Sequence, residues 1–152
     1  MELITQQQID NFLKANTIAI AGASRDEKSF SSQVALHLNK LGYKLWLINP
    51  QYSSIEKQSN HLQSIAELPS DINNLLILTP ANQTESVVAE AIKKGIKNIW
   101  IQQYSDTPNA LKLARENRIN VVHHQCIFMF SQPEGMHKFH HRIKKVFGAL
   151  PK

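Results

Sequence analysis

The sequence contains one cysteine, five glycines and no long apolar run, and these scarcities exclude several classes of protein. A lone cysteine, Cys126, cannot form an internal disulfide, which is typical of a reducing compartment. The longest apolar runs, such as residues 75–78, fall far short of the roughly 20 residues that span a bilayer, so we expect no membrane-spanning helix. The first residues lack the basic start and apolar stretch of a secretory signal, and we therefore expect a cytoplasmic location.

The excess positive charge of the chain lies at its C-terminal end. The net charge of +5 equals the number of basic residues among the last 15, which include no acidic residue. These residues are Lys138, Arg142, Lys144, Lys145 and Lys152. The rest of the chain is neutral overall and carries no recognisable nucleic-acid-binding motif, so we expect no nucleic-acid partner.

Short apolar runs alternate with helical periodicities along the 152 residues, a length typical of one globular domain. The runs predict five strands, at residues 17–21, 44–48, 74–78, 98–101 and 119–122. Helices are predicted between most of them, with Ser32 as one cap and Gly42 and Gly95 as terminators. A capping box from Thr5 to Gln8 predicts one more helix before the first strand.

This alternation is typical of parallel strands joined by right-handed crossovers, with helices on both faces of the sheet. We expect an α/β fold with a Rossmann-like, doubly wound parallel sheet of five strands in the order 3-2-1-4-5, numbered along the chain. Residues 51–72 do not continue the alternation of strands and helices, and their sequence predicts only a short helical segment around residues 62–68.

Near the C-terminus, apolar residues recur at spacings of three and four, which predicts an amphipathic helix. They include Met136, Phe139, Ile143 and Leu150. We therefore divide the chain into a domain at residues 1–134 and a basic helix at residues 135–152. That helix has three possible docking surfaces: its own domain, a second subunit in a homodimer, or a membrane surface.

The loop after the first strand is the first candidate site. In a doubly wound sheet, ligands bind beyond the carboxyl ends of the strands where the strand order reverses, here the loops after the first and fourth strands. Gly22 and Ala23 permit a close backbone turn before a helix, and Ser24, Arg25 and Lys28 offer donors to phosphate oxygens. The alternative interpretation is a tight turn with solvated charges.

Two features of this region argue against a nicotinamide cofactor. The loop has a single glycine instead of the three of the dinucleotide fingerprint. The second strand ends in Asn49 and Pro50, whereas dinucleotide folds place an acidic residue there to bind the ribose hydroxyls.

An ordered set of short segments resembles the small stand-alone CoA-binding proteins, a family similar to the N-terminal CoA-binding domain of the succinyl-CoA synthetase α subunit. The segments are Ile-Ala-Gly-Ala-Ser at 20–24, Gly-Tyr-Lys at 42–44, Ile-Asn-Pro at 48–50, Leu-Thr-Pro at 78–80, Trp-Ile-Gln-Gln at 100–103 and Gln-Cys-Ile at 125–127, with the tail at 137–140 and 148–152. The resemblance covers nearly the whole chain and points to a bacterial branch.

The resemblance implies a Rossmann-type domain that binds coenzyme A as its ligand. It places the pyrophosphate over Gly22, Ala23 and Ser24, with Arg25 and Lys28 facing phosphates. It also implies that the adenine rests near Asn49 and Pro50, that Thr79 and Pro80 flank the ligand, and that Gln102 lies near the pantetheine arm.

No catalytic constellation is evident, so the first hypothesis is a non-catalytic module that binds CoA or acyl-CoA. The alternatives are a small enzyme that uses NAD(P) or acyl-CoA on the same fold, with His123 as an unassigned base, and an interaction module with a degenerate pocket. Cys126 has two interpretations: a buried small side chain, or a thiol that forms a mixed disulfide with CoA.

The seven histidines raise the question of a metal site. His123 and His124 are adjacent, and His137 and His141 stand one helical turn apart, but no cysteine or carboxylate is placed in sequence to complete a site. We therefore expect solvated or packed histidines and no metal.

Overall fold

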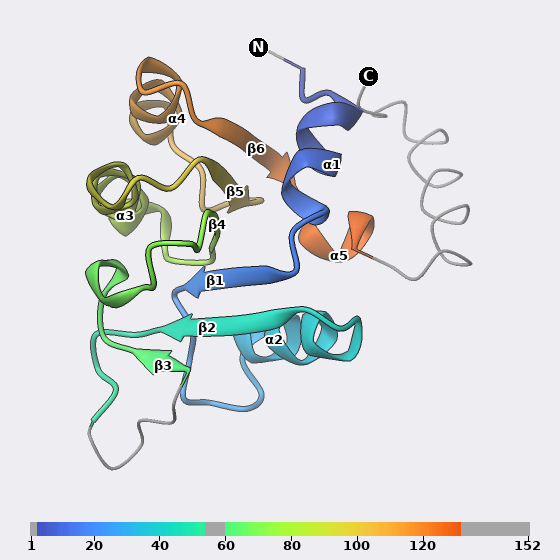
Figure 1. Cartoon of the computed structure of the whole chain (residues 1–152), viewed down its shortest axis with the longest axis vertical. Coiled ribbons are helices and arrows are strands. Elements are labelled where there is room, and N and C mark those ends of the chain that lie inside the picture. Colours follow the sequence, from blue (N-terminus) through green and yellow to red (C-terminus); the bar gives the residue numbers. More distant parts are fainter. Residues whose placement is uncertain (1–2, 54–59, 132–152) are drawn as a thin grey trace.

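The computed structural model describes residues 3–53 and 60–131, which form a parallel sheet with helices on both faces (Figure 1). The strands are β1 (Thr17–Ala21), β2 (Lys44–Ile48), β3 (His61–Leu62), β4 (Asn74–Ile77), β5 (Asn98–Gln102) and β6 (Asn120–Gln125), in the order β3-β2-β1-β4-β5-β6. The helices are α1 (Gln6–Leu13), α2 (Phe30–Lys40), α3 (Ala81–Lys94), α4 (Pro108–Glu116) and α5 (Ile127–Phe130), with a 3-10 turn at Ile65–Glu67.

The structure confirms the α/β, Rossmann-like class and changes the strand order. The predicted order placed residues 74–78 at the sheet edge, but β4 pairs with β1 at the centre, for example through Ala19 and Leu75. The edge position belongs to β3, a sixth strand of two residues that pairs with the end of β2. Such a short strand carries no apolar run, which is why periodicity did not reveal it.

Hydrogen bonds at the helix ends confirm most of the predicted caps. Thr5 and Gln8 form the predicted capping box: the Gln8 amide donates to Thr5 Oγ1 (3.2 Å) and the Thr5 amide donates to Gln8 Oε1 (2.9 Å). The cap of α2 differs from the prediction, because Ser29 occupies it and accepts a hydrogen bond from the Ser32 amide. The helix predicted at 135–152, with its possible role in a homodimer, lies outside the described residues.

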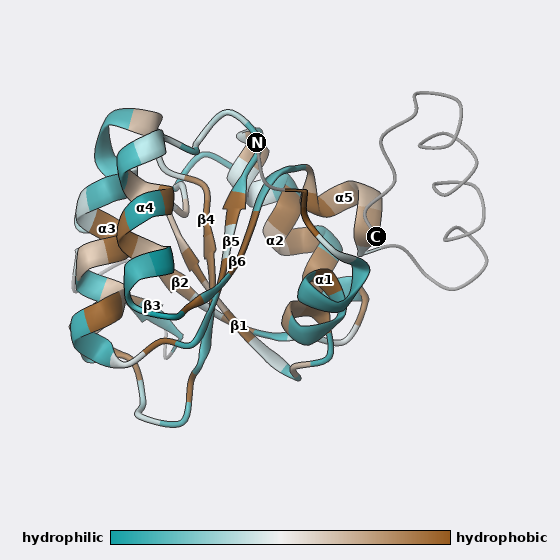
Figure 2. Cartoon of the chain, turned by 90° about the horizontal axis from the view of Figure 1, so that it is seen from above, coloured by the Kyte–Doolittle hydropathy of each residue, from teal (hydrophilic) through white to brown (hydrophobic). Residues whose placement is uncertain are grey.

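Helices cover both faces of the sheet, with α3 and α4 on one side and α1, α2 and α5 on the other (Figure 2), and alternate strand residues pack into the core on each side. In β1, Ile18 and Ile20 pack with the apolar residues of α1, α2 and α5. Ala19 and Ala21 pack with those of α3 and α4. Burial on both faces explains why the strands appear in the sequence as continuous apolar runs.

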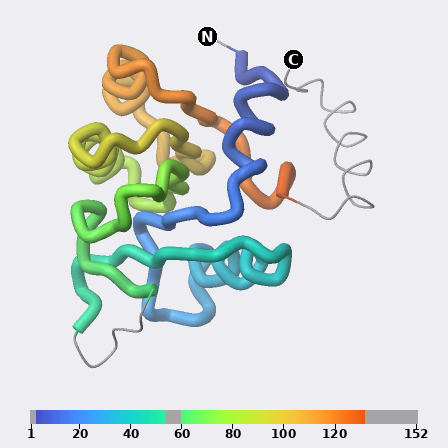
Figure 3. The backbone as a smooth tube through the Cα atoms, viewed as in Figure 1, coloured from blue at the N-terminus to red at the C-terminus, as the bar shows by residue number. Residues whose placement is uncertain are grey.

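Helix α1 lies beside β6, although the two are far apart in the sequence (Figure 3). Gln8 Nε2 donates to the Val121 carbonyl (3.3 Å), and Asn120 Nδ2 donates to the Gln8 carbonyl (3.1 Å). Within the described residues, no helix combines the length and hydropathy needed to cross a bilayer.

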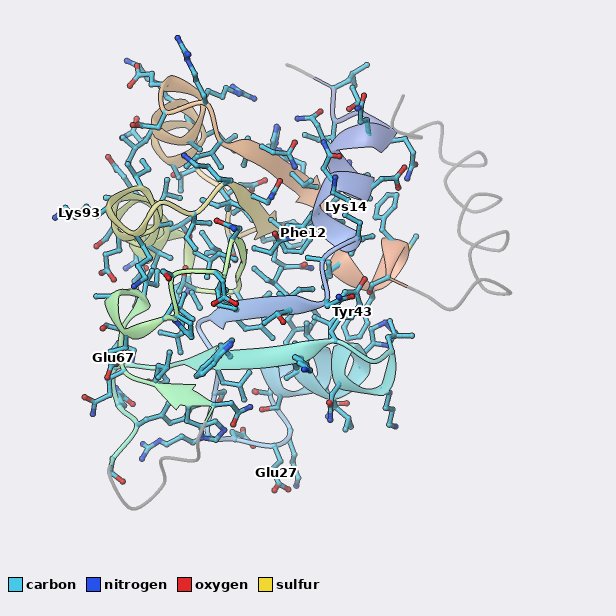
Figure 4. All side chains as sticks on the ribbon, in the orientation of Figure 1. Phe12, Lys14, Glu27, Tyr43, Glu67 and Lys93 are labelled. Atoms are coloured by element: carbon cyan, nitrogen blue, oxygen red, sulfur yellow. The ribbon has the colours of Figure 1, made fainter. Side chains whose placement is uncertain are left out.

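Phe12 anchors α1 to the sheet (Figure 4). Its side chain is fully buried and meets Trp100 edge to face, with the ring centroids 5.5 Å apart. Asn74 Nδ2, on the central strand β4, donates to the Phe12 carbonyl (2.6 Å). Apolar packing and a buried hydrogen bond therefore hold the same turn of the helix.

We expect Phe12→Ala to lower the free energy of unfolding by about 3–5 kcal/mol, because it removes a buried ring and leaves a cavity beside Trp100. Leu36→Ala is a matched control, since Leu36 lies on α2 with half of its surface exposed, and should cost under about 1 kcal/mol. Urea unfolding followed by circular dichroism measures both. Equal losses for the two variants would contradict the anchoring role of Phe12.

Candidate functional site

The strand order of the sheet reverses between β1 and β4. From β1 the chain continues into α2 on one face, and from β4 it continues into α3 on the other. The loops after these two strands therefore diverge to opposite faces at the carboxyl edge of the sheet, where doubly wound folds bind ligands. The first predicted loop does lie where the strand order reverses, but the second loop there follows β4 at Leu78, and not the strand at 98–101.

Gly22, the first residue after β1, is pressed against the backbone of the loop after β4. Its φ is +88°, in the left-handed region that favours glycine. A Cβ atom there would lie 2.8 Å from the Leu78 carbonyl carbon and 2.8 Å from the Thr79 nitrogen. The Leu78 amide also donates to the Ala21 carbonyl (2.9 Å), so glycine is required where the two loops meet.

A pocket of about 360 Å³ opens above this contact. Six predicted site residues line it: Gly22, Ala23, Asn49, Pro50, Thr79 and Pro80. The remaining lining residues are Ala21, Ile48, Gln51, Gln63, Ser64, Ile65, Gln83, Val87 and Glu90. We call this space the switch-point pocket. The fold thus brings together the ends of β1, β2 and β4, as the resemblance implied.

Asn49 ties two walls of the switch-point pocket together. Its Nδ2 donates to the Ala23 carbonyl (2.8 Å), and its Oδ1 accepts from the Gln51 amide (2.8 Å). Its own backbone amide donates to the Leu62 carbonyl (3.0 Å), which fixes β3 beside β2. Asn49 therefore shapes the rim of the pocket, with both ends of its side-chain amide engaged within the protein.

Ser24, Arg25 and Lys28 lie on the outer part of the β1–α2 loop and do not line the switch-point pocket. The loop is held by short-range bonds: Ser24 Oγ accepts from the Asp26 amide (3.0 Å), and Asp26 Oδ1 accepts from the Lys28 amide (2.9 Å). Arg25 and Lys28 are exposed, and Glu27 marks the outer tip of the loop (Figure 4). The cations thus stand beside the pocket.

Gln102 belongs to a second pocket of about 280 Å³ at the same edge of the sheet. It ends β5, is buried, and accepts a hydrogen bond from the Ile127 amide at its Oε1 (3.0 Å). Phe30, Leu78 and the half-buried Cys126 line the same pocket. We call it the Cys126 pocket.

Sequence reasoning missed the residues that close the outer side of the switch-point pocket. Gln63 and Ser64 follow β3, the strand without an apolar run. Gln83, Val87 and Glu90 come from one face of α3, at spacings of four and three. That helical spacing was readable in the sequence, but only the position of α3 shows that this face borders the pocket.

A comparison with protein families assigns this architecture. Residues 16–132 match the family described as the CoA binding domain. The chain belongs to this CoA-binding domain family.

Relatives of this CoA-binding domain include a much longer protein. The α subunit of the ADP-forming acetate–CoA ligase II of Pyrococcus furiosus is 23% identical over 118 residues. The match covers 76% of this chain but only 26% of the relative, so the chain corresponds to about a quarter of that subunit.

Solved structures with this fold include both small and large proteins. A hypothetical protein of Pyrococcus horikoshii superimposes with a TM-score of 0.73 and 28% identity, over 82% of this chain and 87% of that one. An acetyl-coenzyme A synthetase of Ca. Korarchaeum cryptofilum, solved with phosphate and ADP, has a TM-score of 0.63 and 20% identity, over 74% of this chain and 26% of that one. The bacterial branch stays a prediction.

We expect Gly22→Ala to lower the free energy of unfolding by about 2–5 kcal/mol. About 1–2 kcal/mol comes from the left-handed backbone and about 1–3 kcal/mol from the collision with Leu78 and Thr79. Gly95→Ala is the matched control, because Gly95 has a φ of +85° and no atom lies within 4 Å of the place that its Cβ would take. Chemical denaturation of both variants isolates the collision, and equal losses would contradict the close contact.

Proposed function

We propose that this CoA-binding domain is a non-catalytic protein that holds CoA or acyl-CoA, with the pyrophosphate at the loop after β1. The observation that supports this most is the switch-point pocket, whose base is Gly22 packed on the backbone of Leu78 and Thr79. Glycine at residue 22 lets the two loops meet, and the backbone after β1 then borders the pocket, where a diphosphate can approach it.

In this proposal the nucleotide end of the ligand occupies the switch-point pocket, with the adenine beside Asn49 and Pro50. Arg25 and Lys28, exposed on the adjacent loop, contribute charge to the phosphates. The pantetheine arm runs along the carboxyl edge of the sheet past Thr79 and Pro80 towards Gln102. The Cys126 pocket lies at that end and receives the thiol or its acyl group.

The chemistry of the pocket favours binding over catalysis. Among the described residues that line the switch-point pocket, Glu90 is the single ionisable group, so these residues form no acid–base pair. His123, the base left open for an acyl-CoA enzyme, lines neither the switch-point pocket nor the Cys126 pocket. An amide at residue 49, bonded on both sides, also offers no carboxylate to a nicotinamide ribose.

The named activity of the Pyrococcus furiosus relative belongs to a subunit of which this chain matches 26%. We propose that this domain senses CoA or its thioester, stores it, or presents it to another protein. We propose no nucleic-acid ligand and a cytoplasmic location.

Calorimetric titration with CoA, acetyl-CoA, dephospho-CoA, NAD and AMP tests the ligand class. We expect CoA and acetyl-CoA to bind more tightly than AMP, because AMP lacks the diphosphate and the pantetheine arm. NAD should bind more weakly than CoA, since residue 49 carries no acidic group for the ribose. Binding of NAD at least as tight as that of CoA would contradict the proposal.

A second set of titrations tests the position of the phosphates. Arg25→Ala and Lys28→Ala should each weaken CoA binding roughly tenfold or more, since a hydrogen bond to a charged group contributes about 1.5–3 kcal/mol. Lys112→Ala is the matched control: it removes the same charge from an exposed position on α4, where Lys112 pairs weakly with Glu116 at 3.9 Å. Equal losses in all variants would indicate only a general charge effect.

A further inference from the structure

Three side chains outside both pockets converge at the ends of β5 and β6. They are Asp106, in the loop after β5, and His123 and His124, near the end of β6. One ligand atom from each lies within 4.8 Å of the others. His123 is 2% exposed, whereas the side chain of His124 is half exposed and gives access from solvent.

The backbone of β6 is bent to bring the two imidazoles together. Adjacent strand residues normally point to opposite faces, as Val121 and Val122 do. His124 instead has a φ of +57°, a left-handed conformation that a histidine rarely adopts. Its Nδ1 consequently lies 2.5 Å from Nδ1 of His123.

Asp106 holds this turn in place. One carboxylate oxygen, Oδ2, accepts from the His124 backbone amide (2.8 Å) and lies 3.0 Å from His124 Nδ1. The Asp106 side chain is nearly buried, with 8% of its surface exposed. Two imidazole nitrogens and a carboxylate thus face one small volume.

While Arg115 contacts His123 Nε2, no arrangement of protons satisfies every contact in this cluster. Arg115 only donates, so its 3.3 Å contact makes His123 Nε2 the acceptor and leaves the His123 proton on Nδ1. If His124 Nδ1 accepts a hydrogen bond from that proton, the nitrogen carries no hydrogen of its own. It then has nothing to donate to the Asp106 carboxylate, 3.0 Å away. If His124 Nδ1 carries its own proton, two N–H groups oppose each other.

A cation resolves the conflict, because each of the three groups can direct a lone pair at it. We propose that His123 Nδ1, His124 Nδ1 and the Asp106 carboxylate bind a divalent first-row transition metal such as Zn²⁺. Two imidazoles and a carboxylate are typical ligands of this class of ion, with a water molecule in the fourth position. Mg²⁺ prefers oxygen ligands alone and should not compete.

Small movements suffice for binding. Ligand atoms about 2.1 Å from a tetrahedral ion stand roughly 3.4 Å apart, so the half-exposed His124 ring must rotate away from His123. His123 then carries its proton on Nε2, and the exposed Arg115 side chain has to withdraw from it. The metal site is independent of the proposed CoA binding, since its three ligands line neither of those pockets.

Titration of untagged full-length protein with Zn²⁺, in competition with a chromophoric chelator, tests the site. We expect one equivalent of Zn²⁺ to bind and excess Mg²⁺ to leave the binding unchanged. His124→Asn should weaken it more than about 100-fold, because loss of a ligand exceeds the roughly 10–100-fold cost of an outer-shell change. Asparagine tolerates the left-handed backbone, so this variant should fold normally. Asp106→Asn should also weaken binding.

The matched control is the double variant His137→Asn/His141→Asn, which removes two histidines outside the cluster and should bind Zn²⁺ as the wild type does. Absorption bands of bound Co²⁺ report the coordination directly and should disappear in His124→Asn. Wild-type protein without stoichiometric Zn²⁺ binding, or binding lost only in the tail variant, would overturn the proposal. Unchanged CoA titrations in His124→Asn would show that the two sites are separate.

Discussion

The contact between Gly22 and the backbone of Leu78 and Thr79 is the constraint on which the switch-point pocket depends. It joins the loops after β1 and β4, the two central strands, at the point where the chain departs to opposite faces of the sheet. The switch-point pocket lies at this meeting of the two loops, with Gly22 and Thr79 both in its lining. Asn49 links the end of β2 to the loop after β1, because its side-chain amide donates a hydrogen bond to the Ala23 carbonyl.

The described lining of the switch-point pocket mixes polar and apolar residues and holds one charged side chain, Glu90, whereas Arg25 and Lys28 lie on the neighbouring loop. In the proposed complex the diphosphate lies over Gly22, and the two cations on the adjacent loop face it from outside the pocket. A deeply buried cation in such a pocket would have to be desolvated before a ligand arrived, which is costly. Exposed Arg25 and Lys28 avoid that cost and still contribute attraction at short range.

The pockets and the polar side chains lie at the carboxyl edge of the sheet for a geometric reason. In a parallel sheet every strand ends at the same edge, so the residues after β1, β2, β4, β5 and β6 become neighbours there. The two pockets and the Asp106–His123–His124 cluster all lie along this edge. The cluster differs from the pockets in that it depends on one left-handed residue, His124, which breaks the alternation of its strand.

The sequence by itself determined the fold class. Strands buried on both faces require continuous apolar runs, and the helices between them require caps and terminators. It also singled out Gly22, Asn49 and Thr79, which line one pocket in the structure, since short segments at strand ends carry a recognisable family pattern. Only the tertiary structure decided that β4 pairs with β1, that β3 forms the edge, and that Gln63, Gln83 and Glu90 close the pocket. Strand pairing and the lining of a pocket arise from contacts between residues far apart in the chain, and no local sequence pattern predicts such contacts. The approach of Asp106 to His124 has the same origin.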